Sequence, residues 1–418
     1  MTFANINYQQ PKVIKLTTPI NKVDLIVHGQ GIIVFDASGA CCIDFFDSES
    51  TSGIKVQFTE SNVLVNMYPS NEPLIDKDNK KGIITQEGAY YWFSIDSQNQ
   101  RLCAGIGEAR RENAIYNFQF MNVNHDEAER KRNKLFLESI VSASVNDLTI
   151  TSLLRDPITG YLPLFVKNTD SLYMESIAAG KYMPKANLSL VSQKLYDCIS
   201  GKRFQLNTPD FPNFTKAIEY SIATPGKWCH KCLKQKATEF DKENPNKKET
   251  YLRITLGENN GESPGIPYVM EIWPVGHYSP VHNHGNSSAI IRVLHGSINV
   301  SLFPFLSSDK VEPFAKADFI KGDITWISPS LNQVHQLHNL ETNKDTCITI
   351  QCYMYEMTDT IHYDYFDYLN SNNSSKGAFE QNSDADFIEF KNIIKKEWKE
   401  HTKSKSYWSD LFDFRKKK

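Results

Sequence analysis

Two histidines one residue apart, His282 and His284, stand in an apolar stretch that reads PVHNHGNSSAIIRVLHG. Side chains two positions apart on a β-strand point to the same face, so the two imidazoles would project together into whatever the strand encloses. Neutral imidazole is the commonest side-chain ligand of protein-bound metals. The pair therefore provides two ligands of a predicted metal site, and a third must come from another strand.

A second stretch, WISPSLNQVHQLHN, supplies the third ligand in His335, with Asn339 four residues further on. His338 is close enough to His335 in the sequence to be a rival ligand. Two histidines on a strand can also be ordinary hydrogen-bonded residues without a metal. The glycines that flank the first stretch, Gly276 and Gly296, complete a spacing that favours the metal interpretation.

The predicted site has no carboxylate ligand. Many metal-binding β-barrels place a glutamate four or five residues after the second histidine, and here these positions hold Ser288 and Ala289. Three neutral imidazoles leave one side of a metal open and its positive charge uncompensated, so an anionic substrate donor can bind there. A thiolate and an iron ion fit this description best.

The series Tyr251-Leu-Arg253, the two histidine segments and Tyr353, in this order, resembles the cysteine dioxygenases, which are thiol dioxygenases of the cupin superfamily. The resemblance covers about residues 188–367, less than half of the chain. It implies a non-haem Fe(2+) centre whose ligands are His282, His284 and His335. The implied reaction is the oxidation of L-cysteine by O2 to cysteine sulfinic acid, a step of cysteine catabolism.

The same resemblance implies that Arg253 pairs with the carboxylate of the substrate and that Tyr251 assists it. A guanidinium is a planar, bidentate partner for a carboxylate. Tyr353 matches an active-site tyrosine whose hydroxyl hydrogen-bonds the bound oxygen or the substrate. From residue type alone, the alternatives are a surface arginine on a strand and an ordinary aromatic residue of the barrel core.

The sequence departs from the family at two positions near Tyr353. Animal members link this tyrosine to a cysteine, and Ala289 stands in its place, so no such crosslink can form. Gln351 replaces a histidine in the series Thr349-Ile-Gln351-Cys-Tyr353. Glutamine donates and accepts hydrogen bonds but does not titrate near neutral pH. We expect Gln351 near the substrate, and 3-mercaptopropionate and cysteamine stay open as alternatives to L-cysteine.

Two other functions stay open as well. A cupin protein can use the same three histidines for another oxidation or an isomerisation, and a metal-binding barrel can serve as a scaffold without catalysis. The motif WCHKC, residues 228–232, has the form of a redox-active dithiol. It follows a Pro225-Gly226 turn instead of a strand, which argues against redox activity.

The sequence predicts a mainly β protein whose C-terminal barrel positions these residues. Two amphipathic segments, LSLVSQKLYDCIS and NFTKAIEYSIA, predict helices ahead of β-rich sequence that begins at Tyr251. We therefore expect a cupin, or jelly-roll, barrel over residues 188–367, preceded by helices. Short strands and regular turns upstream predict an antiparallel β-sandwich-like domain of unknown role at residues 1–124. A helical or irregular connector is expected between them, at residues 125–187.

The last part of the chain, residues 368–418, predicts a polar linker and a terminal amphipathic helix. Ser383 is expected to cap this helix. Its apolar face would carry Phe387, Phe390, Ile394 and Trp398.

Composition places few limits on partners. The 418 residues carry 46 basic and 49 acidic side chains, so no strong field directs the chain to nucleic acid or to an anionic membrane. The first fifteen residues lack the apolar core of a signal peptide, and no apolar run approaches the ~18 residues of a membrane span. Eight cysteines are too sparse for a disulfide scaffold. We expect a cytoplasmic protein whose partners are a small thiol and O2. The sequence predicts no protein partner.

Overall fold

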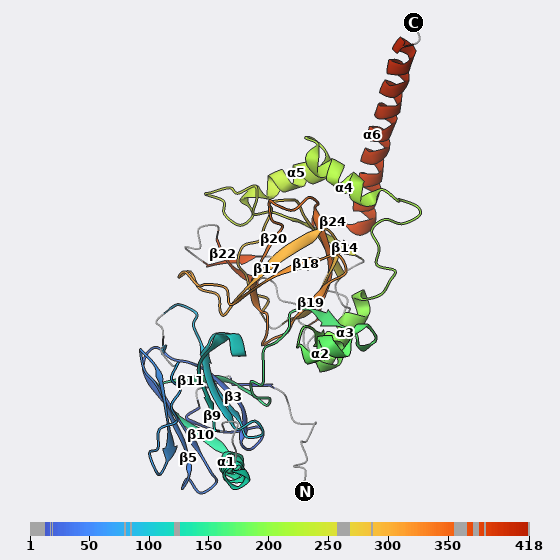
Figure 1. Ribbon diagram of the computed structural model, residues 1–418. Helices are drawn as coiled ribbons and strands as arrows, with labels where there is room; N and C mark the ends of the chain where they lie inside the picture. Colours follow the sequence, from blue (N-terminus) through green and yellow to red (C-terminus); the bar gives the residue numbers. More distant parts are fainter. Residues whose placement is uncertain are drawn as a thin grey trace. The chain divides into compact units, whose positions relative to one another are not determined.

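The chain divides into two compact units, Met1–Leu162 and Pro163–Lys418 (Figure 1). The computed structural model describes residues 13–16, 18, 20–78, 81–83, 86–120, 126–256, 268–285, 287–354, 366–370, 376–379 and 382–416. No helix in these ranges is both long enough and apolar enough to span a bilayer.

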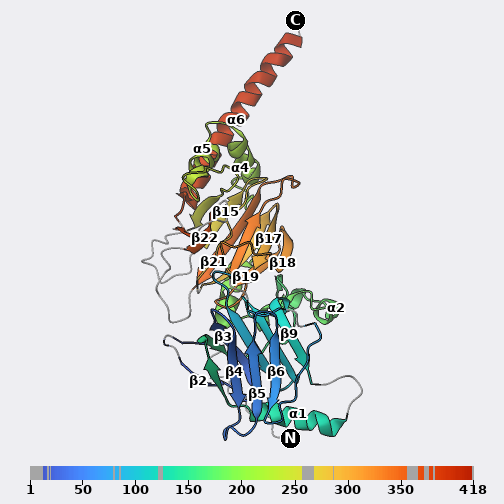
Figure 2. The ribbon, with the colours of Figure 1, turned by 90° about the vertical axis from the view of Figure 1, so that its left-hand side faces the viewer.

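The first unit contains two antiparallel sheets around an apolar core (Figure 2). One sheet has the order β1-β11-β3-β7-β8-β9 and the other β2-β10-β4-β5-β6. The strands are β1 (Val13–Lys15), β2 (Lys22–Asp24), β3 (Gln30–Asp36), β4 (Cys41–Phe46), β5 (Gly53–Phe58), β6 (Val63–Tyr68), β7 (Tyr91–Asp96), β8 (Arg101–Ile106), β9 (Ala114–Gln119), β10 (Ser142–Asn146) and β11 (Thr149–Leu154). Alternation decides which face is inside: in β4, Cys41, Ile43 and Phe45 are buried and the residues between them are not.

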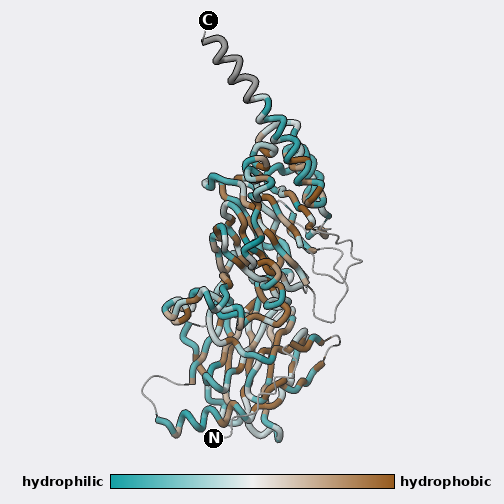
Figure 3. Tube along the Cα trace, turned by 90° about the vertical axis from the view of Figure 1, so that its right-hand side faces the viewer, coloured by the Kyte–Doolittle hydropathy of each residue, from teal (hydrophilic) through white to brown (hydrophobic). Residues whose placement is uncertain are grey.

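The prediction of a helical or irregular connector over residues 125–187 is wrong for part of this range. The expected helix is present as α1 (Glu127–Ser139), capped by Asp126, and Figure 3 colours most of its residues as hydrophilic. It is followed by β10 and β11, which pair with β4 and β3. Asp147 makes the tight turn between these two strands with a φ of 61°, a conformation that aspartate tolerates. The strand character of both segments comes from these pairings, which the local sequence pattern does not show.

The second unit is built on two sheets that share an apolar interior. The larger has the order β19-β16-β21-β15-β14-β24 and the smaller β18-β17-β20. The strands are β14 (Leu252–Leu256), β15 (Tyr268–Trp273), β16 (Ser288–His295), β17 (Ser297–Phe303), β18 (Ala315–Ile320), β19 (Ile324–Ile327), β20 (Val334–His338), β21 (Cys347–Met354) and β24 (Ala385–Asp386). Trp273 and Val293 from the larger sheet pack with Ile298, Val300 and Phe319 from the smaller one. The prediction of a mainly β protein with antiparallel sheets is confirmed, while the domain boundaries stay predictions.

Both predicted helices ahead of the barrel are present. Along the sequence, the elements between β11 and β14 are β12 (Val166–Lys167), α2 (Met174–Ala178), β13 (Met183–Pro184), α3 (Leu190–Ile199), α4 (Phe214–Ala223) and α5 (Trp228–Gln235), with short 3₁₀ turns at Thr169–Ser171, Lys185–Asn187 and Lys236–Thr238. A further 3₁₀ turn, Arg111–Asn113, lies between β8 and β9 of the first unit. The WCHKC motif lies in α5, where Cys229 is buried in an apolar cluster. Burial raises the pKa of the Cys232 thiol to about 11, so neither cysteine has the character of a reactive thiolate.

The C-terminal segment is more closely integrated than a linker and a tethered helix. A hairpin of β22 (Phe366–Leu369) and β23 (Lys376–Phe379) occupies part of the expected linker, and residues 371–375 lie outside the described ranges. Gly377 allows this pairing, because a Cβ there would stand 2.6 Å from the ring of Tyr368. The helix α6 (Phe387–Lys416) follows β24, which pairs with β14.

The predicted cap of α6 is also wrong. Asp386, not Ser383, accepts the hydrogen bond from the backbone N–H of Ile388. The Ser383 hydroxyl instead accepts from the Thr255 N–H and donates to the Arg253 carbonyl. The Ser383 side chain is thus bound to the backbone of β14 and does not cap α6.

The apolar face of α6 should contribute measurably to stability. Ile394 is fully buried with Phe390 against α4, whereas Ile388 is 65% exposed on the same helix. Ile394→Ala should lower the free energy of unfolding of the second unit by about 2–5 kcal/mol, because a cavity replaces the side chain. Ile388→Ala is the matched control and should change it by less than about 0.5 kcal/mol. Denaturant unfolding of both variants checks this, and equal midpoints would show that α6 is not packed as described.

Candidate metal centre

The segment that carries His282 and His284 lies between two strands. It precedes β16 and pairs with β20 on one side, where the backbones of His282 and His335 exchange two hydrogen bonds of 3.0 Å. On the other side it pairs with β22, where the Leu369 N–H donates to the Val281 carbonyl. The extended backbone expected for the HNH motif is therefore imposed by its two neighbours. The pairing with β20 also explains why His335, which is distant in the sequence, lies opposite His282.

The three predicted ligands converge. Their ring centroids are 4.7–4.8 Å apart in each pair, and one ring nitrogen of each lies within 4.8 Å of the others. No aspartate, glutamate or cysteine among the described residues belongs to the group. The structure thus brings together the three histidines that spacing selected, without a carboxylate, and this group could hold a metal ion.

The protonation of these imidazoles suits metal binding. The carbonyl of Pro280 accepts from His282 Nδ1 at 3.0 Å, which leaves Nε2 with its lone pair. Burial lowers the pKa of His282 to about 4 and the pKa values of His284 and His335 well below the usual range, where the neighbouring imidazoles add to the effect. His284 Nδ1 is buried without a hydrogen-bond partner among the described residues. All three rings are neutral at pH 7, the form that ligates a metal.

The other nearby histidines lie outside this group. His338, the rival ligand, is 3.4 Å from Glu341 and packs on the ring of Tyr278. His277 contacts the carbonyl and hydroxyl of Thr250 through Nδ1. Residues 335 and 338 of one strand point to opposite faces, which is why only His335 reaches the interior.

Arg253 lines the same pocket but already has an acidic partner. Its Nη1 donates to Glu271 Oε1 at 3.1 Å, and the two side chains are 9% and 7% exposed. Arg253 and Glu271 face each other across the β14/β15 pair. Burial raises the pKa of Glu271, and the guanidinium opposes this. Arg253 is therefore not a surface arginine. If it pairs with the carboxylate of a substrate, it does so beside the carboxylate of Glu271, which the sequence motifs did not predict.

The sequence does hold a signal for Glu271. The strand reads YVMEIW, and one carboxylate in the middle of an apolar strand is unusual, because a buried charge is costly unless it is paired. Residues 271 and 273 share a face, so Glu271 and Trp273 enter the pocket together. Tyr251 stacks on Trp273 with ring centroids 4.1 Å apart.

Tyr353 lies beside the histidine group. Its ring is parallel to that of His284, at 6.1 Å, and its hydroxyl donates to Gln351 Oε1 at 2.8 Å. Burial raises the pKa of Tyr353, so the phenol keeps its proton. Thr349 Oγ1 is buried without a hydrogen-bond partner in the described ranges, so the chain of hydrogen bonds from Tyr353 reaches Gln351 and does not continue to Thr349.

The rest of the pocket wall is mainly apolar. Ala289, fully buried, lies opposite Tyr353 across the β16/β21 pair and packs with Val269, Ile291 and Ile327. Phe366 contacts the His284 ring with centroids 4.7 Å apart. The position where other barrels carry a ligand glutamate is thus filled by hydrocarbon. The carboxylate and the guanidinium that line the pocket are those of Glu271 and Arg253.

The remaining motif residues are structural. Gly296 turns the chain between β16 and β17 with a φ of 67°, and a Cβ there would stand 2.6 Å from the Thr346 carbonyl oxygen. The Asn339 side chain donates to the Trp273 and Asp345 carbonyls. These residues fix the ends of strands, and none of them enters the pocket.

The low pKa values of the three histidines predict a pH-dependent stability. Unfolding exposes the imidazoles and returns their pKa to about 6.5, so the unfolded chain binds more protons. The free energy of unfolding of chelator-treated protein should therefore be highest above pH 6.5 and fall towards pH 4, by up to about 1.4 kcal/mol per pH unit for each histidine. Urea unfolding between pH 7 and pH 5 measures the slope. His284→Gln should make it shallower, and an unchanged slope would count against a buried neutral imidazole at this position.

Comparisons with known proteins give only a partial likeness. No protein-family model matches the chain. Among solved structures, the cupin domain of Schizosaccharomyces pombe Cnp3 matches at 12% identity over 25% of this chain and 65% of that one, with a TM-score of 0.20. An oxalate oxidase in complex with the substrate analogue glycolate matches at 16% over 26% and 52%, with a TM-score of 0.21. The DMSP lyase DddQ of Ruegeria pomeroyi matches at 15% over 26% and 49%, with a TM-score of 0.20.

In each case the match spans less than two thirds of the other chain. At these identities and TM-scores, neither the fold nor the activity of this protein follows from the likeness.

Proposed function

We propose that the second unit is an iron-dependent thiol dioxygenase that oxidises L-cysteine with O2 to cysteine sulfinic acid. The observation that carries the proposal is the group of three neutral histidines, with no carboxylate, in the wall of a pocket that also contains Arg253 and Tyr353. The resemblance of the residues between Tyr251 and Tyr353 to cysteine dioxygenases supports it. We also propose that the protein acts in the cytoplasm, where cysteines stay reduced, because all eight of its cysteines are free thiols.

The residues fit a ferrous ion. His282, His284 and His335 would hold it, and imidazole ligands suit iron among the divalent metals. When bound, Fe(2+) supplies open coordination positions and the redox chemistry that O2 needs. The overall reaction balances as R–SH + O2 → R–SO2H: sulfur loses four electrons, O2 gains four, and both oxygen atoms end on sulfur. No further reductant is required.

The chain's own residues would bind and orient the substrate. Arg253 would meet the substrate carboxylate, and the Tyr353 hydroxyl, whose proton is directed to Gln351, would accept a hydrogen bond from the substrate through its oxygen. Gln351 accepts from that hydroxyl and so fixes its direction. The apolar wall from Ile291, Phe366 and their neighbours limits the entry of water. Tyr251, stacked on Trp273, would complete the side of the pocket near Arg253.

The test is aerobic oxidation of a thiol panel by protein loaded with one equivalent of ferrous iron under anaerobic conditions. We expect L-cysteine to consume one O2 per sulfinate formed, measured by oxygen electrode and by chromatography of the product. If the protein oxidises 3-mercaptopropionate or cysteamine faster than L-cysteine, it is still a thiol dioxygenase, but its substrate is that thiol. Protein that holds iron but consumes no O2 with any thiol would refute the dioxygenase, and protein that holds no iron would favour a scaffold.

A further inference from the structure

The backbone of Arg253 is bound by two residues of the C-terminal segment. The Asp384 carboxylate accepts from the Arg253 N–H at 2.7 Å, and the Asp384 N–H donates to the Arg253 carbonyl at 2.8 Å. The Ser383 hydroxyl donates to the same carbonyl at 3.2 Å. Asp384 lies 131 positions after Arg253, beyond the part of the chain that resembles the cysteine dioxygenases. This edge of β14 therefore depends on a segment that the resemblance does not cover.

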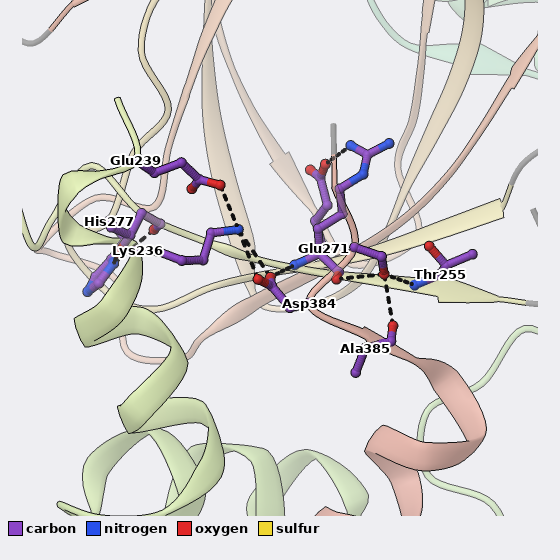
Figure 4. Close-up of polar contacts among 10 residues, drawn as sticks. Lys236, Glu239, Thr255, Glu271, His277, Asp384 and Ala385 are labelled. Carbon is purple, nitrogen blue, oxygen red and sulfur yellow. Dashed lines mark hydrogen bonds and ion pairs between the residues drawn. The ribbon is translucent and has the colours of Figure 1, made fainter. Parts of the chain in front are cut away.

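A buried lysine compensates the charge of the Asp384 carboxylate. Lys236 Nζ lies 3.1 Å from Asp384 Oδ2 and 3.3 Å from Glu239 Oε1, and Figure 4 shows Lys236 with both carboxylates. The Lys236 side chain is 10% exposed and that of Asp384 is 16% exposed. Without the ammonium group, two carboxylates would remain near each other in a mostly buried site, where like charges repel more strongly than in water.

The same ammonium group also contacts an aromatic residue of the pocket. Lys236 Nζ lies over the ring of Tyr251, 5.4 Å from its centroid, which is within the range of a cation–π interaction. Tyr251 and Arg253 are two positions apart in the sequence, and both line the pocket. Lys236 thus contacts Tyr251 directly and reaches Arg253 through Asp384.

An ion pair with a structural role alone is the simpler alternative. The pair of Lys227 with Glu400 is of this kind, because its side chains are 23% and 56% exposed and it joins α5 to α6. The pair of Lys236 with Asp384 is more deeply buried. Removing two charges from water costs several kcal/mol per ion, and apolar residues in place of a buried pair are often neutral or stabilising. Stability alone therefore does not account for a buried cation at this position, and its contacts with Tyr251 and Asp384 do.

We infer that Lys236 is a positioning residue of the pocket. Through Asp384 it fixes the backbone of Arg253, and through its ammonium group it fixes the ring of Tyr251. The inference rests on the proposed function, in which Arg253 and Tyr251 recognise the substrate carboxylate. A small displacement of a group that orients the substrate is enough to weaken its contact. Loss of Lys236 should therefore reduce carboxylate recognition and leave the three histidines as they are.

The first measurement is binding of L-cysteine and of cysteamine to chelator-treated protein under argon, by ligand-detected NMR titration, which needs neither iron nor turnover. Lys236→Met should weaken binding of L-cysteine about tenfold and binding of cysteamine, which has no carboxylate, less than about twofold. Lys236→Arg keeps the cation and should restore binding of L-cysteine. Lys227→Met, on the residue before α5, is the control and should change neither affinity. Equal losses for both ligands, or no loss, would overturn the inference.

The second measurement is hydrogen exchange of the Arg253 amide, which tests the anchor without any ligand. This amide donates to the Asp384 carboxylate, so its exchange should be about tenfold faster in Lys236→Met and unchanged in Lys227→Met. Unchanged exchange in Lys236→Met would show that the lysine does not fix the strand. If Lys236→Met does not fold, Asp384→Asn replaces it, because it keeps an oxygen for the Arg253 N–H but loses the ion pair. It should change both measurements in the same direction, and no change in either would contradict the inference.

The positioning role and the proposed function can fail separately. Unmodified protein that binds L-cysteine no better than cysteamine contradicts carboxylate recognition by Arg253, and the exchange of its amide still decides whether Lys236 fixes the strand. In iron-loaded protein that oxidises L-cysteine, Lys236→Met should raise KM and leave kcat within about twofold, as expected when a binding contact is lost. An unchanged KM would contradict the positioning role alone, since the dioxygenase activity would remain.

Discussion

Protein in which His335 is replaced by alanine should no longer retain a stoichiometric metal ion. His335 is one of three converging imidazoles, with ring centroids 4.7 Å from those of both His282 and His284, and the described residues offer no carboxylate to replace it. Changes around metal ligands already cost 10–100-fold in affinity, so loss of a ligand should cost at least about 100-fold. The measurement is iron per chain after loading with one equivalent and desalting.

The same strand offers a matched control. His338, three residues further along β20, contacts Glu341 and Tyr278 and lies outside the histidine group. His338→Ala should retain iron as the unmodified protein does. If iron were lost with His338 and kept without His335, the ligand set would be wrong.

Removal of the guanidinium alone should destabilise the second unit strongly. Arg253→Met leaves the Glu271 carboxylate buried without its cationic partner, and breaking such a pair costs about 3–5 kcal/mol. Because the pKa of Glu271 is already raised by burial, the unpaired carboxyl can take up a proton as the pH falls. The destabilisation should therefore be larger at pH 8 than at pH 5.5. Urea unfolding at both pH values gives the comparison.

The double variant Arg253→Met, Glu271→Leu removes both charges and should recover most of the lost stability. It should not recover the oxidation of L-cysteine, because the guanidinium that would meet the substrate carboxylate is gone. The outcome that contradicts this account is a single variant as stable as the double one, which would mean that Glu271 is solvated or has another partner.

The histidine group could be predicted from the sequence because its geometry is largely local. Residues 282 and 284 share a face in any extended segment. In the second motif, residues 335 and 338 of one strand face opposite ways, so only one of these two histidines can point to the interior. The choice of His335 over His338 depends on register, which the His282–His335 bridge sets. Sequence spacing alone left this choice open.

Glu271 could not be assigned from the sequence in the same way. Its significance depends on β14 and β15 pairing in a register that places it opposite Arg253, and this register is a non-local property. The same reason applies to β10 and β11, whose strand character comes from pairing with β4 and β3, and to the pairing of β24 with β14. In each case the position of the residue or strand depends on pairing with a segment distant in the sequence, which a local sequence pattern does not show.

The central claim is that this pocket transfers both atoms of O2 to the sulfur of one thiol. Its most direct test is turnover of L-cysteine by the iron-loaded protein under ¹⁸O2 in unlabelled water, followed by mass spectrometry of the product. We expect cysteine sulfinic acid with both oxygen atoms labelled from the unmodified protein, and no cysteine sulfinic acid from the His335→Ala variant. Disulfide or hydrogen peroxide as the main product, or sulfinate whose oxygen comes from water, would contradict it.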